Sequence, residues 1–181
     1  MKTKCSLLAL ALTATLLSGS LKAQNACFLP QVTSATNPAP VGSTTGDFNE
    51  DGIKDIAVTN QTGTVSIFLG LGNGTYGAAT NLAAGAQPYG IKTADFDNDN
   101  NLDIVISNMT NFGYFSVFLG TGTGTFGPPV TYPVGSQTKK VAVGDVNNDG
   151  NMDVAAINTS SLTVSICLGT GMGNFINPIN F

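Results

Sequence analysis

The sequence contains no histidine, no arginine and no tryptophan among its 181 residues. Histidine is the commonest general base near neutral pH, so its absence removes the most frequent participant in acid–base catalysis. Beyond residue 23, only four lysines accompany 11 acidic residues, which gives a formal net charge of −7. Phosphate contacts need clusters of basic side chains, so this balance excludes nucleic acid as an expected partner.

The sequence also has no long apolar run. Its most apolar stretch, Leu7–Leu17, has 11 residues, which is too short to span a bilayer, so no membrane insertion is expected. Lys2 and Lys4 precede this stretch and the small residue Ala23 follows it, in the order typical of a secretory signal peptide. We therefore predict a signal peptide over residues 1–23 and a protein that is secreted or held at the cell surface.

Cysteine is scarce, and two cysteines, Cys27 and Cys167, remain after the predicted cleavage. Cys167 lies in Ser-Ile-Cys-Leu-Gly, where two earlier copies of the segment have Phe68 and Phe118. It therefore occupies an apolar strand position. Two alternatives stay open: a buried free thiol that acts as a small hydrophobe, or a disulfide to Cys27, which an exported protein permits.

Internal repeats are the main feature of the remaining sequence. Asp47, Asp95 and Asp145 each open an acidic segment, at spacings of 48 and 50 residues. No window has apolar residues at helical spacing over three turns, and short runs rich in Val, Ile, Thr and Phe alternate with Gly, Asn and Asp turns. The sequence therefore predicts an all-β fold of repeated four-stranded antiparallel units, which fits radial propeller blades better than a sandwich.

The units can be bounded by comparing the copies. The second unit predicts strands at residues 89–94, 103–107, 114–119 and 126–134. The predicted regions are an N-terminal segment at 24–40 with a lone outer strand at 28–33, and three repeats at about 41–85, 86–134 and 135–181. A closing strand at 175–181 brings the expected total to thirteen strands.

The acidic segments contain all 11 acidic residues of the chain. Calcium takes six to eight hard oxygen ligands, and alternate residues of a tight nine-residue loop can point inward. Positions 1, 3, 5 and 9 would supply side-chain oxygens and position 7 its carbonyl, while position 6 must turn sharply. The predicted ligands are Asp47, Asn49, Asp51, Ile53 and Asp55 in the first loop, Asp95, Asp97, Asp99, Asn101 and Asp103 in the second, and Asp145, Asn147, Asp149, Asn151 and Asp153 in the third.

Two competing motifs fail on their context. An EF-hand needs a Glu at position 12 and flanking helices, whereas position 12 here is Val58, Ile106 or Ala156, inside predicted strands. The segments beginning at Gly72 and Gly122 match G-x-G-x-x-G, but a dinucleotide fingerprint must open a helix. We interpret both as turns within blades, and we predict that about three Ca²⁺ ions bind in the acidic loops.

The segments GDFNEDGIKDIAV, ADFDNDNNLDIVI and GDVNNDGNMDVAA, each followed by LGLGNGTY, LGTGTGTF or LGTGMGNF, resemble the FG-GAP/VCBS repeats of integrin α-subunit propellers. The resemblance covers residues 28–181. It implies a propeller in which calcium loops on one face hold the first two strands of each blade together. Families of this kind form seven-bladed rings, so three repeats imply a partial, three-bladed propeller.

The resemblance implies adhesion or ligand binding without catalysis, with a protein or a glycan at the cell surface as partner. Two alternatives stay open: a lectin-like propeller, for which Tyr76, Tyr89, Tyr114 and Tyr132 are the candidate aromatic residues, and an accessory domain of a larger exported hydrolase. Three blades would leave apolar faces uncovered, so we also expect either further blades in a longer chain or self-association.

Overall fold

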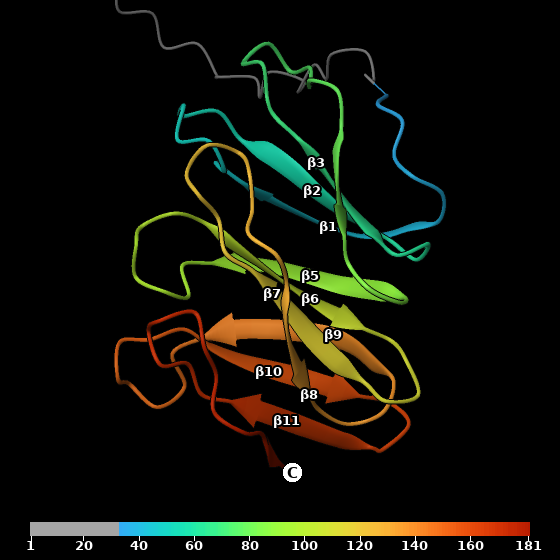
Figure 1. Cartoon of the computed structure of the whole chain (residues 1–181), viewed down its shortest axis with the longest axis vertical. Coiled ribbons are helices and arrows are strands. Elements are labelled where there is room, and N and C mark those ends of the chain that lie inside the picture. Colours follow the sequence, from blue (N-terminus) through green and yellow to red (C-terminus); the bar gives the residue numbers. More distant parts are fainter. Residues whose placement is uncertain (1–32) are drawn as a thin grey trace, which may run out of the picture. The chain divides into compact units, whose positions relative to one another are not determined.

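The structure is a computed structural model that describes residues 33–181. The predicted signal peptide and nearly all of the predicted lone strand at 28–33 lie outside the described residues. Residues 33–181 form twelve strands in three four-stranded antiparallel sheets (Figure 1), and no helix in this range is long and apolar enough to cross a membrane. The prediction of an all-β fold with four-stranded repeated units is confirmed.

Each sheet is a simple meander, with its strands in chain order. The strands of the first, second and third blades are β1 (Pro40–Gly46), β2 (Asp55–Asn60), β3 (Thr64–Phe68) and β4 (Thr80–Ala83); β5 (Pro88–Ala94), β6 (Asp103–Asn108), β7 (Tyr114–Phe118) and β8 (Val130–Pro133); and β9 (Thr138–Gly144), β10 (Asp153–Asn158), β11 (Thr163–Cys167) and β12 (Ile179–Asn180). The strands β1, β5 and β9 each form one edge of their sheet, and β5 contacts both β1 and β9.

The fourth strands of the second and third blades are shorter than predicted. The prediction over residues 126–134 is wrong at its start, because Phe126 forms only an isolated bridge with Gly120 and β8 begins at Val130. The late start belongs to the repeat and not to Pro128 and Pro129, because Tyr76 also forms only an isolated bridge and β4 begins at Thr80, with Ala78 and Ala79 in the places of the prolines. The closing strand of the third blade is likewise reduced to the two residues of β12.

The hydrophobic core lies between neighbouring blades. Phe48, which follows β1, is buried against the second blade, where its ring meets Phe126 edge to face at 5.5 Å between centroids. Phe96, which follows β5, repeats this contact with Phe175 of the third blade, also at 5.5 Å. The phenylalanine after each of these edge strands therefore joins one blade to the next.

Hydroxyl groups join the second strand of one blade to the edge strand of the next. Thr59 in β2 donates a hydrogen bond from Oγ1 to the carbonyl oxygen of Tyr89 in β5, at 2.6 Å. Ser107 in β6 repeats the contact with the carbonyl oxygen of Lys139 in β9, at 3.0 Å. The strands approach so closely that a Cβ atom on Gly90 would lie 2.9 Å from that same Lys139 oxygen.

The third blade differs on its outer side. Val146 occupies the position of the buried Phe48 and is 57% exposed, and Ile157 occupies the position of the buried Thr59 and is 45% exposed. In the part of the chain that the structure describes, no further sheet covers these side chains. Cys167 lies on the opposite, covered side as a buried free thiol, and burial raises its pKa to about 11.

Candidate metal centre

Each acidic loop directly follows the edge strand of its blade and turns sharply at its sixth residue. The φ angles there are positive: 82° at Gly52, 70° at Asn100 and 89° at Gly150. Glycine adopts this left-handed conformation freely, and asparagine tolerates it better than most residues. The predicted turn at position 6 is confirmed in all three loops.

The first aspartate of each loop fixes this turn. Its Oδ2 atom accepts a hydrogen bond from the backbone N–H of position 6 in each of three pairs: Gly52 to Asp47 at 2.8 Å, Asn100 to Asp95 at 2.9 Å, and Gly150 to Asp145 at 2.9 Å. The aspartate at position 5 accepts from the N–H of position 7 at 2.8 Å in all three loops, through Oδ1 of Asp51, Asp99 and Asp149. The three loops therefore share one backbone geometry.

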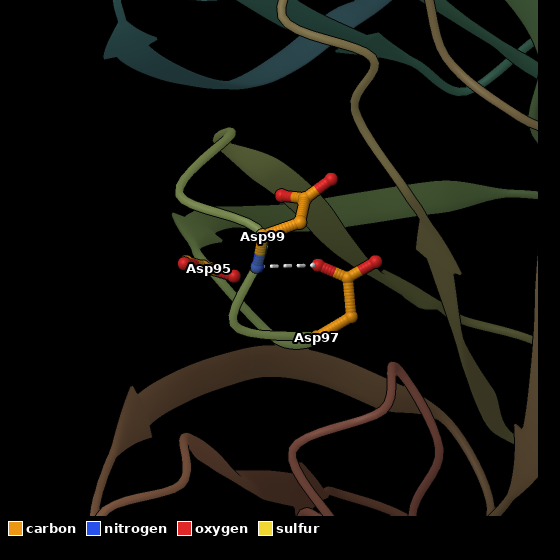
Figure 2. Close-up of side chains that lie close together, drawn as sticks. All are labelled: Asp95, Asp97 and Asp99. Carbon is orange, nitrogen blue, oxygen red and sulfur yellow. Dashed lines mark hydrogen bonds between the residues drawn. The ribbon is translucent and has the colours of Figure 1, made fainter.

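The second loop gathers three carboxylates into a small volume. One oxygen from each of Asp95, Asp97 and Asp99 lies within 4.8 Å of the other two, and Figure 2 shows the three side chains around the turn. The N–H of Asp99 also donates to Oδ1 of Asp97 at 3.3 Å. Clustered carboxylate oxygens are the ligands that calcium prefers, so this donor set fits a calcium ion.

The charges within this group act on one another. Partial burial raises the pKa of Asp97, and the neighbouring charge of Asp99 raises it further. The pKa of Asp99 is instead lowered, mainly because its carboxylate accepts the backbone N–H of Asn101. A bound cation would offset the repulsion between these carboxylates.

The first and third loops have asparagine at position 3, so each has three acidic side chains at the predicted ligand positions where the second loop has four. The side-chain amide of Asn49 donates to Oδ2 of Asp51 at 2.9 Å, and Asn147 makes the same contact with Asp149 at 2.9 Å. An amide oxygen can also bind calcium, but it adds no charge. The carbonyl ligands predicted at position 7, in Ile53, Asn101 and Asn151, stay predictions.

The aspartate at position 9 has a structural role that sequence reasoning missed. It is buried in every loop, and its two oxygens accept backbone N–H groups from loop position 2 and from a glycine after the third strand. These donors are Phe48 and Gly70 for Asp55 (2.7 and 2.7 Å), Phe96 and Gly120 for Asp103 (2.7 and 2.7 Å), and Val146 and Gly169 for Asp153 (2.9 and 2.8 Å). The role of this aspartate as a metal ligand stays a prediction.

Burial dominates the electrostatics of position 9. Desolvation raises the pKa of Asp103 to about 6, although the two N–H groups that it accepts act in the opposite direction. By accepting these two N–H groups, the carboxylate of Asp103 connects the acidic loop to the Gly-rich turn of the same blade. The repeated Leu-Gly after each third strand was the signal that could have revealed the connection, since Gly70, Gly120 and Gly169 are its partners.

Position 4 of each loop was also missed. Its φ angle is positive although it is never glycine: 59° at Glu50, 61° at Asn98 and 61° at Asn148. The side chain of Asn98 donates to Oδ1 of Asn151 at 3.2 Å and to the carbonyl oxygen of Gly171 at 3.3 Å, both in the third blade. The acidic loop of the second blade therefore also contacts its neighbour.

The Gly-rich segments are turns within blades, as predicted, and no helix follows them in residues 33–181. They also form hydrogen bonds with the acidic loop of the preceding blade. The N–H of Gly124 donates to the carbonyl oxygen of Phe48 at 2.7 Å, and the N–H of Gly173 donates to that of Phe96 at 2.9 Å.

These sheets and loops define a repeat protein built of β-propeller-like blades, each with an acidic loop after its first strand. The model of the FG-GAP-like repeat family matches residues 47–106 and 95–156, and both matches begin at the first aspartate of an acidic loop. The chain belongs to the FG-GAP-like repeat family. No curated protein matched the chain.

Proposed function

We propose that this chain is an exported, calcium-binding β-propeller module that binds a ligand at the cell surface and catalyses no reaction. The observation that carries the proposal is the acidic loop, which recurs three times with one backbone geometry and gathers Asp95, Asp97 and Asp99 within 4.8 Å. One calcium ion in each loop, about three in all, would satisfy these oxygens. Calcium would also hold the first two strands of each blade together.

The expected gain in stability follows from mass action. An extracellular module binds calcium with a dissociation constant of about 10⁻⁴ M, and calcium at ten times that concentration stabilises a site by about 1.4 kcal/mol. Three such sites together would contribute a free energy comparable to the net stability of a small domain.

The distribution of carboxylates supports a role without catalysis. Asp103 is the carboxylate whose pKa lies near 6, but both of its oxygens accept backbone N–H groups in the interior. The groove between the edge strands β1, β5 and β9 has no carboxylate among its lining residues. A nucleophile and a base would have to be found elsewhere, and histidine is absent from the sequence.

Calcium titration of the mature chain tests the metal part of the proposal. We expect about three ions per chain by calorimetry and elemental analysis, and a melting temperature that falls by several degrees in chelator. Asp51→Ala, Asp99→Ala and Asp149→Ala should each remove one ion. Glu50→Ala is the matched control, because Glu50 is exposed in the same loop at a position off the predicted ligands.

A melting temperature that chelator does not change, together with no metal in elemental analysis, would contradict the calcium proposal. Export is tested separately, by locating the protein in culture fractions with and without residues 1–23. Binding of the calcium-loaded protein to whole cells, with and without enzymatic removal of surface glycans, separates a protein ligand from a glycan ligand.

A further inference from the structure

The first strands of the three blades enclose a groove at their free edges. Its volume is about 270 Å³, and residues from β1, β5 and β9 all contribute to it. The lining residues are Val41, Gly42, Ser43, Tyr89, Gly90, Ile91, Lys92, Lys139, Lys140 and Val141. The groove is therefore built by the repetition of the blades and not by one blade alone.

Positive charge is concentrated at this groove. Residues 33–181 contain four lysines, and three of them, Lys92, Lys139 and Lys140, line it. Lys92 is exposed and Lys139 is half-buried, so their ammonium groups can reach a ligand. Lys140 pairs with Ile157 and therefore directs its side chain to the outer face of the third blade, so it lines the groove through its backbone. All 11 acidic residues lie in the three acidic loops, and none of them lines the groove. An acidic protein thus carries one cationic surface.

The backbone of the groove favours a compact ligand over an extended peptide. A peptide that adds a strand to a sheet needs a continuous row of free backbone groups along the edge. Here the hydroxyl of Thr59 already occupies the carbonyl oxygen of Tyr89, and the hydroxyl of Ser107 occupies that of Lys139. Ser107 also accepts the N–H of Gly90 at 2.8 Å. At the edge of β5, both an N–H group and a carbonyl oxygen are therefore already hydrogen-bonded.

The polar and aromatic lining groups of the groove suit an acidic sugar. Ammonium groups pair with carboxylates, Ser43 offers a hydroxyl group, and the ring of Tyr89 offers an apolar surface with a polar end. We propose that the groove between β1, β5 and β9 binds a carboxylate-bearing oligosaccharide through Lys92 and Lys139. This inference rests on the proposed ligand-binding function and names its ligand class.

Calorimetric titration of the calcium-loaded mature chain with trigalacturonate tests the proposal, with maltotriose as the neutral sugar of the same length. We expect binding of trigalacturonate and none of maltotriose. Lys92→Gln and Lys139→Gln should each weaken binding by about fivefold, a typical effect of losing one partly screened charge pair. Lys54→Gln is the matched control, because Lys54 is an exposed lysine outside the groove and should bind as the parent does.

Two further titrations, one at higher ionic strength and one with a second probe, complete the experiment. Raising the ionic strength to about 0.5 M shortens the screening length to about 4 Å and should weaken binding. Triglutamate carries the same charge on a peptide backbone and should bind more weakly than trigalacturonate.

Three results would overturn the proposal: no heat of trigalacturonate binding while calcium binding and the melting temperature are intact, equal weakening by Lys54→Gln, or tighter binding of triglutamate. The first result leaves the proposed calcium-binding function standing, whereas loss of calcium binding itself would refute that function separately.

Discussion

Replacing Asp103 by alanine is expected to destabilise the fold whether or not calcium is present. The carboxylate is buried, and its two oxygens accept the N–H groups of Phe96 and Gly120 at 2.7 Å each. Alanine leaves two buried N–H groups without an acceptor, at a cost of about 1–3 kcal/mol each. We expect a loss of about 3 kcal/mol in the free energy of unfolding, near the lower end of the sum because water can enter beside the shorter side chain.

Asp99→Ala is the matched comparison, because Asp99 belongs to the same loop but is exposed. In chelator, an exposed substitution of this kind should cost no more than about 0.5 kcal/mol. In calcium at ten times the dissociation constant, the same variant should lose about a further 1.4 kcal/mol, the free energy of the lost site. The assay is urea unfolding followed by circular dichroism, with each variant measured in chelator and in calcium.

The result that refutes this reasoning is equal destabilisation of the two variants in chelator. A loss in Asp103→Ala that appears only in calcium would also refute it, since position 9 would then act through the metal and not through the backbone. Should Asp103→Ala fail to fold, Asp103→Asn keeps one acceptor oxygen and should retain part of the stability, again independently of calcium.

Three further predictions follow from burial and backbone geometry. Phe48→Ala should lower the free energy of urea unfolding by about 3 kcal/mol and Val146→Ala by less than about 1 kcal/mol, because of these two residues only Phe48 is buried between blades. Equal losses would contradict the packing of Phe48 as the contact that joins the first two blades. Asn100→Gly should raise the free energy of unfolding by about 0.5 kcal/mol, since its φ of 70° suits glycine; a lower stability would show that its side chain matters more. In a Cys27→Ser variant, Cys167 should react with a thiol reagent only after unfolding, because burial raises its pKa to about 11; rapid reaction of the folded protein would argue against a buried thiol.

The fold could be predicted from the sequence because its determinants are local and repeated. Short runs rich in Val, Ile, Thr and Phe between turn residues specify the strands, and the left-handed turn at Gly52, Asn100 and Gly150 follows from residue types that tolerate it. The strand bounds were less predictable at the fourth strands, where Tyr76 and Phe126 form only isolated bridges and the ladder starts later, at Thr80 and Val130.

The role of position 9 could not be predicted in the same way. An aspartate in an acidic loop looks the same in the sequence whether its carboxylate binds a metal ion or accepts a backbone N–H group. The two functions differ only through a partner that is distant along the chain: Asp55 meets Gly70, and Asp103 meets Gly120. The left-handed backbone at Glu50 escaped prediction because glutamate has no preference for it, and the geometry of the neighbouring loop residues determines it.

The acidic loops join neighbouring blades, and under the proposed function they would also bind a cation. The residue at position 2 joins the next blade through its ring and its carbonyl oxygen, as Phe48 and Phe96 show. The residue at position 4 adds a polar contact in the case of Asn98. Because a cation would order the same nine residues, its binding would stabilise the junction between blades as well as the hairpin within one. In the third loop, Val146 meets no further blade in residues 33–181, so a cation there would stabilise its own hairpin alone.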